Sequence, residues 1–381
     1  MIYSRLDILD YSMNFQLGKS IDNLPTLSEL VEILVRLQEA TPVLHLSPFN
    51  AVVRDNNKYI ITRLVSGRYS IKPNISQKSF LYRGENQFYK SAVPTEFRHG
   101  NNDAVLLANI RANDFVAMMQ SHPLYRMLSN GIRLSDRETV RVENPYGMAS
   151  CYGLETLNLS LTSDLRAAAF YAVSDYDSET NSYKQVIPTE RDETKIGAIY
   201  AFFLAMPFPT IYGLSAVGFI PFPHLENQRT FVFQMSNGMV FERHPLQKKF
   251  YFRHDAEIDK RFFNSFHQGA DLTLPDEILS KAKLLMTTKQ VSKAAFKKNL
   301  SDNPRDKEDV NMRRMEGMGF QISDIDFSFT DQELATYRQR ISLGYWQSFC
   351  DQLDFSELRS KNAREIFCDL PNNPNYQRFF I

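Results

Sequence analysis

Residues 157–172 constrain the fold most, because a strand pattern there runs directly into a helix pattern. Leu157, Leu159 and Leu161 alternate with polar residues, which is the spacing of a strand with one buried face. An alanine-rich run follows, and Ser163 is expected to cap the helix that this run forms. The chain must therefore hold a half-buried strand and a helix side by side.

A second strand pattern is the apolar run at residues 80–82. Gly84 is expected to end this strand in a turn. Arg83 stands at the strand end, where a rigid element can present a guanidinium to an anionic ligand. A structural ion pair explains an arginine at this position equally well, so both interpretations stay open.

Other elements follow from spacing and composition. Thr26 and Glu29 form a capping box that opens a helix over residues 27–40. Apolar spacing predicts two helices within 104–128, and an unbroken apolar run predicts a buried strand over 197–206. The remaining predictions are a hairpin at 51–62, a surface loop over 175–193, closing strands at 239–242 and 250–252, and helices after Pro275 and after Thr330.

These elements divide the chain into three regions. We expect an N-terminal helix and hairpin cap over residues 1–75 and an α+β core over 76–254. A mainly helical C-terminal region is expected over 255–381. Within it, residues 317–331 are a candidate segment for closing the core.

The charges of the chain cancel, with 44 basic and 44 acidic side chains. This balance provides no general attraction to polyanions, so nucleic acid is not the expected partner. No run of apolar residues is long enough to cross a membrane, and the N-terminus lacks the pattern of a signal peptide. We therefore expect a cytoplasmic protein with no membrane partner.

Cysteine and histidine usage gives little sign of metal chemistry. Cys151, Cys350 and Cys368 lack metal-site spacing and are interpreted as free thiols in a reducing compartment. The seven histidines show no ligand spacing either, so the sequence predicts no metal site. The lysines over 281–298 are interpreted as a solvated helix face, with an anionic-partner surface as the alternative.

Three sequence blocks occur in the order of one known family. They are Tyr82-Arg83-Gly84 with Tyr89, Pro94, Phe97 and Arg98; Tyr152-Gly153-Leu154-Glu155-Thr156 with the strand and alanine-rich helix behind it; and Arg229, Gln234 and Gly238. Together these blocks span about 160 residues and resemble the FRG domain family, which is named for its Phe-Arg-Gly signature.

The resemblance implies a fold and a ligand. The fold is α+β, with a mixed, mainly antiparallel split sheet and flanking helices, similar to the ADP-ribosyltransferase fold. The ligand is NAD as a substrate or another nucleotide-like small molecule, and a protein is a candidate acceptor. By position, the resemblance implies catalytic roles for Thr162 and Gln234, and ligand-binding roles for Arg83, Tyr152, Ser160, Ser163 and Arg229.

Each implied role has a chemical reason. The planar fork of Arg83 suits a pyrophosphate better than a lysine would. Tyr152 is interpreted as stacking on nicotinamide or, equally, as a core residue. Ser163 is interpreted either as part of a hydroxyl-rich strand end with Ser160 and Thr162 or as a helix cap.

The chain also departs from these families at important positions. Gln234 stands where transferases have a glutamate, and a glutamine carries no charge to stabilise an oxocarbenium ion. Ser150-Cys151 stands where FRG domains usually have Gln-His. Two hypotheses therefore remain: an ADP-ribosyltransferase or NAD glycohydrolase, and a catalytically inactive FRG module that binds a protein or a nucleotide.

Overall fold

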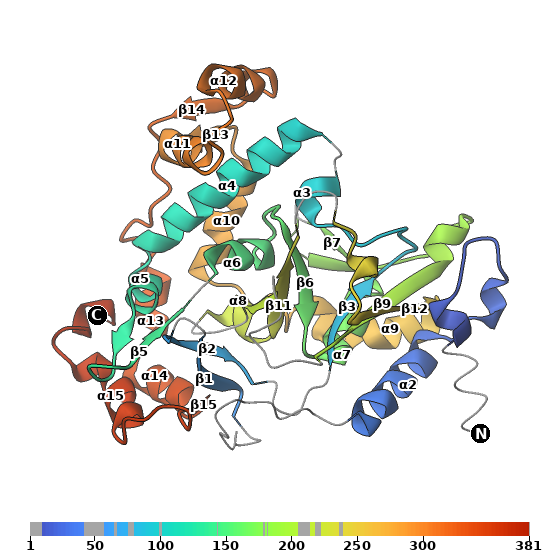
Figure 1. Cartoon of the computed structure of the whole chain (residues 1–381), viewed down its shortest axis with the longest axis horizontal. Coiled ribbons are helices and arrows are strands. Elements are labelled where there is room, and N and C mark those ends of the chain that lie inside the picture. Colours follow the sequence, from blue (N-terminus) through green and yellow to red (C-terminus); the bar gives the residue numbers. More distant parts are fainter. Residues whose placement is uncertain are drawn as a thin grey trace.

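An antiparallel six-stranded sheet, here called the central sheet, lies in the right half of Figure 1. The computed structural model describes residues 10–41, 57–64, 67–74, 80–98, 101–142, 144–177, 180, 182–204, 214–217, 222–235 and 239–380. The strand order of the central sheet is β10 (Leu214–Ala216), β11 (Thr230–Gln234), β6 (Asn158–Thr162), β3 (Phe80–Glu85), β9 (Ile196–Phe203) and β12 (Gln247–Arg253). The predicted α+β class with a mainly antiparallel sheet is confirmed.

The central sheet divides between β3 and β6. These strands pair at a single position, Tyr82 with Thr162. By contrast, β3 pairs with β9 along its whole length, from Phe80 opposite Phe203 to Glu85 opposite Ala198. Beyond the single bridge the two strands are therefore free to separate, and side chains fill or border the space between them.

Gly84 continues β3 and does not end it in a turn, contrary to the prediction. An added Cβ at Gly84 would lie 2.0 Å from the carbonyl oxygen of Ala168 and 2.6 Å from the amide nitrogen of Ala172. Both atoms belong to α7 (Leu165–Tyr171) or its C-terminal cap. The glycine is therefore needed because the helix backbone crosses the strand at contact distance.

Helix α7 begins one residue later than predicted. Asp164, and not Ser163, is its N-cap, because the Asp164 carboxylate accepts a hydrogen bond from the amide of Arg166 at 2.9 Å. Together with α2 (Leu27–Ala40), α7 covers one face of the central sheet. The predicted capping box at Thr26 and Glu29 is confirmed, as are the predicted bounds of α2.

A second sheet, here called the joining sheet, draws strands from distant parts of the chain. Its order is β15 (Leu353–Asp354), β1 (Tyr59–Arg63), β2 (Tyr69–Pro73), β5 (Thr139–Arg141) and β4 (Ile132–Arg133). The β15–β1 and β2–β5 pairs are parallel, and the other two pairs are antiparallel. This sheet therefore contains residues from all three regions that the sequence suggested.

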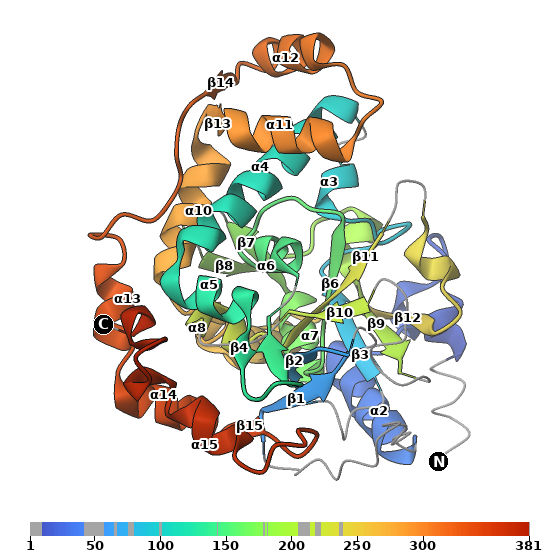
Figure 2. The ribbon, with the colours of Figure 1, turned by 60° about the vertical axis from the view of Figure 1, so that its left-hand side comes forward.

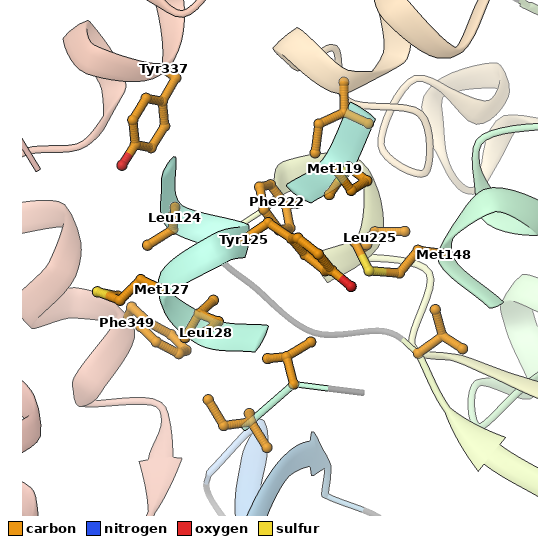
Figure 3. Packing of buried hydrophobic residues seen from close by; sticks show 14 of the residues in the cluster. Met119, Leu124, Tyr125, Met127, Leu128, Met148, Phe222, Leu225, Tyr337 and Phe349 are labelled. Carbon is orange, nitrogen blue, oxygen red and sulfur yellow. The ribbon is translucent and has the colours of Figure 1, made fainter. Parts of the chain in front are cut away.

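The largest apolar cluster packs beside the joining sheet (Figure 3). The predicted pair of helices at 104–128 is confirmed as α4 (Asn102–Ser121) and α5 (Pro123–Asn130). Apolar residues of α5 pack against residues of α4, α6 (Pro145–Cys151), α8 (Pro223–Glu226), α13 (Ala335–Arg340) and α14 (Leu343–Cys350); those labelled are Met119, Leu124, Tyr125, Met127, Leu128, Met148, Phe222, Leu225, Tyr337 and Phe349. Helix α5 thus links the middle of the chain to its C-terminal helices.

Residues 255–380 form mainly helices, and residues 317–331 add no strand to the central sheet. Strand β14 (Gln321–Ser323) pairs in parallel with β13 (Gln290–Ser292) in a small separate sheet. Figures 1 and 2 show this pair with α11 (Lys293–Asp302) and α12 (Glu308–Gly317) at one end of the molecule. The other helices here are α9 (Ala256–Asn264), α10 (Glu277–Thr287) and α15 (Ala363–Cys368).

Several local predictions differ from the structure. The expected loop over 175–193 contains a hairpin of β7 (Ser174–Asp177) and β8 (Ser182–Gln185). The expected strand at 239–242 overlaps a 3-10 turn, η3 (Phe241–Arg243), whereas the closing strand at 250–252 is confirmed within β12. The first half of the hairpin at 51–62 lies outside the described residues. The short elements that remain are α3 (Thr95–Arg98), η1 (Ile21–Asn23), η2 (Asp192–Lys195), η4 (His267–Gly269), η5 (Leu370–Asn372) and η6 (Gln377–Phe379).

Candidate functional site

A cavity of about 370 Å³ lies where β3 and β6 part. Its wall includes the end of β3, the end of β6, the hairpin of β7 and β8, and the segments around α6 and α8. Arg83 and Thr162 both line it, so the C-terminal ends of β3 and β6 border one cavity. Tyr152 and Ser160 line the same cavity.

Arg83 is held by two hydrogen bonds on its own side of the cavity. Its Nη1 donates to the carbonyl oxygen of Ser160 at 3.1 Å, and its Nε donates to Oε1 of Glu85 at 3.4 Å. Residues 83 and 85 point to the same face because side chains alternate along a strand. Among the described residues, no hydrogen-bond partner of Nη2 occurs.

Glu85 is a buried carboxylate in a network of charged and phenolic groups. The hydroxyl of Tyr200 lies 3.1 Å from its Oε2 and 2.7 Å from Oε1 of Glu242, so the two carboxylates share the single proton that this phenol can donate. The Lys249 ammonium lies 3.7 Å from the same Oε2. Burial first, and then the charge of Glu85, raise the pKa of Tyr200, so the phenol keeps its proton and donates it.

Arg98 approaches the cavity from α3. It is solvent-exposed and lines the cavity, so it sits where the cavity meets solvent. The residue as a whole is exposed, but the protein atoms packed near its guanidinium partly desolvate that group, and this desolvation, followed by the positive charge of Arg83, lowers the pKa of Arg98. Its Nε donates to the carbonyl of Val93 at 3.4 Å, and no ion pair of Arg98 occurs among the residues that the structure describes.

The two strand-end hydroxyls have different surroundings. The Thr162 hydroxyl donates to the carbonyl of Gln228 at 3.0 Å and accepts from the amide of Asp164 at 3.1 Å. It therefore fixes the turn into α7, although the residue lines the cavity. Ser160 contributes its carbonyl to Arg83 and is only half buried.

Tyr152 and His224 also line the cavity. Their rings stack with centroids 4.7 Å apart, and the Tyr152 hydroxyl donates to Oδ2 of Asp276 at 2.7 Å. Asp276 also caps α10 through the amides of Ile278 and Leu279. Burial raises the pKa of Asp276 and lowers that of His224, so both shifts favour the uncharged forms.

Tyrosines supply much of the remaining wall. Tyr171, Tyr176 and Tyr183 line the cavity, and the ring centroids of Tyr171 and Tyr183 are 5.9 Å apart. Burial raises the pKa of Tyr171 and Tyr183, so both phenols are neutral at physiological pH. Such rings offer flat apolar faces with a polar edge, which suits a base or a nicotinamide ring.

Three residues implied by the resemblance lie outside the cavity lining. Ser163 is buried, and its amide donates to the carbonyl of Arg229 at 3.4 Å. Arg229 is exposed in a left-handed backbone conformation with φ of 46°. Gln234 is exposed at the far end of β11, opposite Asn158, whereas Thr230 at the near end faces Thr162. The structure thus brings Arg83, Tyr152, Ser160 and Thr162 together, and leaves these three apart.

The sequence did not single out Glu85, Gln228, His224 or Asp276 as site residues. Glu85 could have been predicted from the sequence, because it lies two residues after Arg83 and residues two apart on a strand share a face. No sequence pattern points to Gln228, His224 or Asp276, since only the fold brings them into contact with Tyr152 and Thr162.

The fold and the cavity define an α+β protein whose central sheet opens around an arginine-anchored, tyrosine-walled cavity. No protein-family model, curated protein or solved structure matches this chain. Across the described ranges, no group of histidine, cysteine and acidic side chains is arranged to hold a metal ion. None of the described helices has both the length and the apolar character to span a bilayer.

Proposed function

We propose that this chain is an FRG-like protein that binds a nucleotide, with NAD as the expected ligand, in the cavity between β3 and β6. One observation carries the proposal. Arg83 from the first sequence block and Tyr152, Ser160 and Thr162 from the second line a single cavity at the point where the central sheet divides. The proposed likeness to ADP-ribosyltransferases rests on this split and on the resemblance of the sequence blocks.

The chemistry of the cavity supports a nucleotide. The guanidinium of Arg83 can donate to phosphate oxygens, and charge-assisted hydrogen bonds of this kind are among the strongest in proteins. The tyrosine rings provide stacking surfaces for a base. The volume of about 370 Å³ falls within the range of small-molecule sites.

Binding without transfer is the version that the geometry favours. Gln234 would be the catalytic residue by resemblance, but it lies exposed at the far end of β11 and does not line the cavity. The Thr162 hydroxyl already has a donor and an acceptor partner in the protein. An ADP-ribosyltransferase acting on a protein acceptor is therefore the less favoured form.

A NAD glycohydrolase remains the second candidate because of Glu85. This carboxylate lines the cavity, and a carboxylate beside the ribose helps to cleave an N-glycosidic bond. Its oxygens already receive Arg83, Tyr200 and Lys249, which reduces the charge that it can offer to an oxocarbenium ion. Nicotinamide release that Glu85→Gln abolishes, with NAD binding retained, would establish this candidate.

Ligand-induced stabilisation tests the proposal directly. A ligand at 100 times its dissociation constant should stabilise the protein by about 2.7 kcal/mol, which a thermal shift measures. We expect NAD or ADP-ribose to raise the Tm of the wild type and to lose this effect in Arg83→Gln. Arg166→Gln is the matched control, because Arg166 is an exposed arginine outside the cavity. The proposal is wrong if no nucleotide shifts the wild type, or if Arg83→Gln keeps the full shift.

A further inference from the structure

Two arginines from one chain segment face the same cavity. Arg83 lies on β3, and Arg98 lies on α3, which follows β3 in the chain. The positive charge of Arg83 acts on Arg98, so the two guanidinium groups lie within electrostatic reach of each other. Two like charges at one cavity are unfavourable unless an anion, or acidic side chains, offset them.

The acidic side chains at the cavity offset the two positive charges only in part. Glu85 and Asp175 are the carboxylates that line the cavity. Glu85 is shared with Tyr200 and Lys249, and Asp175 is exposed on the β7–β8 hairpin. The charge of Glu155 also raises the pKa of Arg98. A dianionic ligand would therefore meet two guanidinium groups whose positive charge the carboxylates of the protein do not fully neutralise.

The segment that leads to Arg98 is anchored at residues 88–92. Lys249 donates to the carbonyl of Tyr89 at 2.7 Å, and the amide of Ala92 donates to Glu242 at 2.6 Å. The amide of Phe88 donates to the carbonyl of Glu193 at 2.8 Å. These bonds tie residues 88–92 to β12, to the turn η3 and to the turn η2 before β9.

We propose that Arg98 makes this site selective for nucleotides with a diphosphate, with Arg83 holding one phosphoryl group and Arg98 the other. The inference rests on the proposed function, since it concerns the same cavity. Arg83 donates from Nη1 to Ser160 and from Nε to Glu85, so Nη2 is the terminal nitrogen that these two bonds leave unused. We therefore expect one phosphoryl group to bind Arg83 and a second one to bind the guanidinium of Arg98.

Titration calorimetry with AMP, ADP and ADP-ribose tests this selectivity. We expect the wild type to bind ADP and ADP-ribose roughly 10- to 150-fold more tightly than AMP, the range expected for one charge-assisted contact. Arg98→Gln should remove this preference and change AMP affinity by about twofold or less. Because Arg98 is exposed, the variant should fold, and an unchanged Tm in the absence of ligand checks this. Arg98→Lys should restore only part of the preference, because an ammonium lacks the planar fork.

The two proposals fail in different ways. If none of the three nucleotides binds the wild type, the proposed function is wrong and the selectivity falls with it. If all three bind and Arg83→Gln weakens them, the proposed function holds. In that case the role of Arg98 is overturned if Arg98→Gln leaves the ratio of ADP affinity to AMP affinity unchanged. Equal weakening of ADP and AMP binding is one form of this outcome.

Discussion

The Nη1 atom of Arg83 lies 3.1 Å from the carbonyl oxygen of Ser160, at the place where β3 and β6 stop pairing. A continuing ladder would place Gly84 opposite Ser160, but the only pairing between the two strands is at Tyr82 and Thr162. The side chain of Arg83 thus replaces a backbone partner for the β6 carbonyl. The same guanidinium that we propose as a ligand anchor also bridges the gap in the sheet.

Replacing Gly84 by alanine should destabilise the fold strongly. The new Cβ would lie 2.0 Å from the Ala168 carbonyl oxygen, and backbone atoms of a packed helix cannot give way as a side chain tip can. Overpacking of this kind costs about 1–3 kcal/mol, and we expect the upper end or a failure to fold. Gly317→Ala is the control, since its Cβ would meet no atom within 4 Å. Urea unfolding of both variants measures the difference, and equal stabilities would contradict the close approach of β3 and α7.

Replacing Gln234 by glutamate should leave ligand binding and turnover unchanged. Gln234 is exposed at the end of β11 remote from Thr162, so a new charge there does not reach the cavity and should change stability by no more than about 0.5 kcal/mol. NAD affinity and nicotinamide release of Gln234→Glu, measured beside Glu85→Gln, check this. A gain in nicotinamide release by Gln234→Glu would return residue 234 to the site and favour the transferase hypothesis.

Stability should fall as the pH drops below about 6.5, because of His122. Its Nδ1 accepts from the Tyr125 amide at 3.4 Å, so the proton is on Nε2, which donates to Glu277 at 3.0 Å. Burial lowers the pKa of His122, although Glu277 and Asp276 oppose this shift and Arg340 adds to it. The unfolded chain therefore binds a proton at a pH where the folded chain does not. The free energy of unfolding should fall by up to about 1.4 kcal/mol for each pH unit over this range.

The carboxylate of Glu277 acts in the same direction at lower pH. Burial raises its pKa, but the hydrogen bond from His122 and the charge of Arg340 outweigh burial and hold that pKa below its usual value. Its contribution to stability is thus lost as the pH falls further.

Urea unfolding at several pH values from 7.5 to 5 measures this pH dependence. The free energy of unfolding should change less with pH in His122→Gln than in the wild type.

Cys368 should react with iodoacetamide before Cys151 and Cys350. A hydrogen bond from Cys350, together with the guanidinium of Arg364, lowers the pKa of the Cys368 thiol. Burial raises the pKa of Cys151 to about 12, and the contact with Cys368 followed by burial raises that of Cys350. Since the thiolate is the nucleophile, peptide mapping after brief alkylation at pH 7.5 should find the label on Cys368. Arg364→Gln should slow this labelling, and preferential labelling of Cys151 would contradict the order.

Local hydrogen bonding made part of the fold predictable. The capping box at Thr26 and Glu29 sets the start of α2 from atoms three residues apart, and its bounds were correct. The strand over 197–206 was recognisable because β9 is apolar on both faces. By contrast, Gly84 was misread because a glycine that clears a crossing helix and a glycine in a turn look alike in a sequence.

Only the part of the candidate site that lies at strand ends could be predicted from the sequence. The resemblance implied roles for Arg83 and Thr162 toward one ligand, and both residues line the cavity. Gln234 was misplaced because spacing along a strand does not reveal which end borders the cavity, and β11 turned out to meet β6 with Thr230 opposite Thr162. The contact of Tyr152 with Asp276 and His224 joins residues that no local pattern relates.

The joining sheet has a consequence for synthesis on the ribosome. Strand β1 pairs with β15, and Thr62 beside it hydrogen-bonds Glu357 across a separation of 295 residues. At translation rates of about 5–20 residues per second, the partner of β1 emerges roughly 15–60 s after β1 itself. During that interval one edge of β1 lacks its native neighbour, and open strand edges invite pairing with other chains. The nascent protein is therefore most prone to aggregate before its last helices leave the exit tunnel.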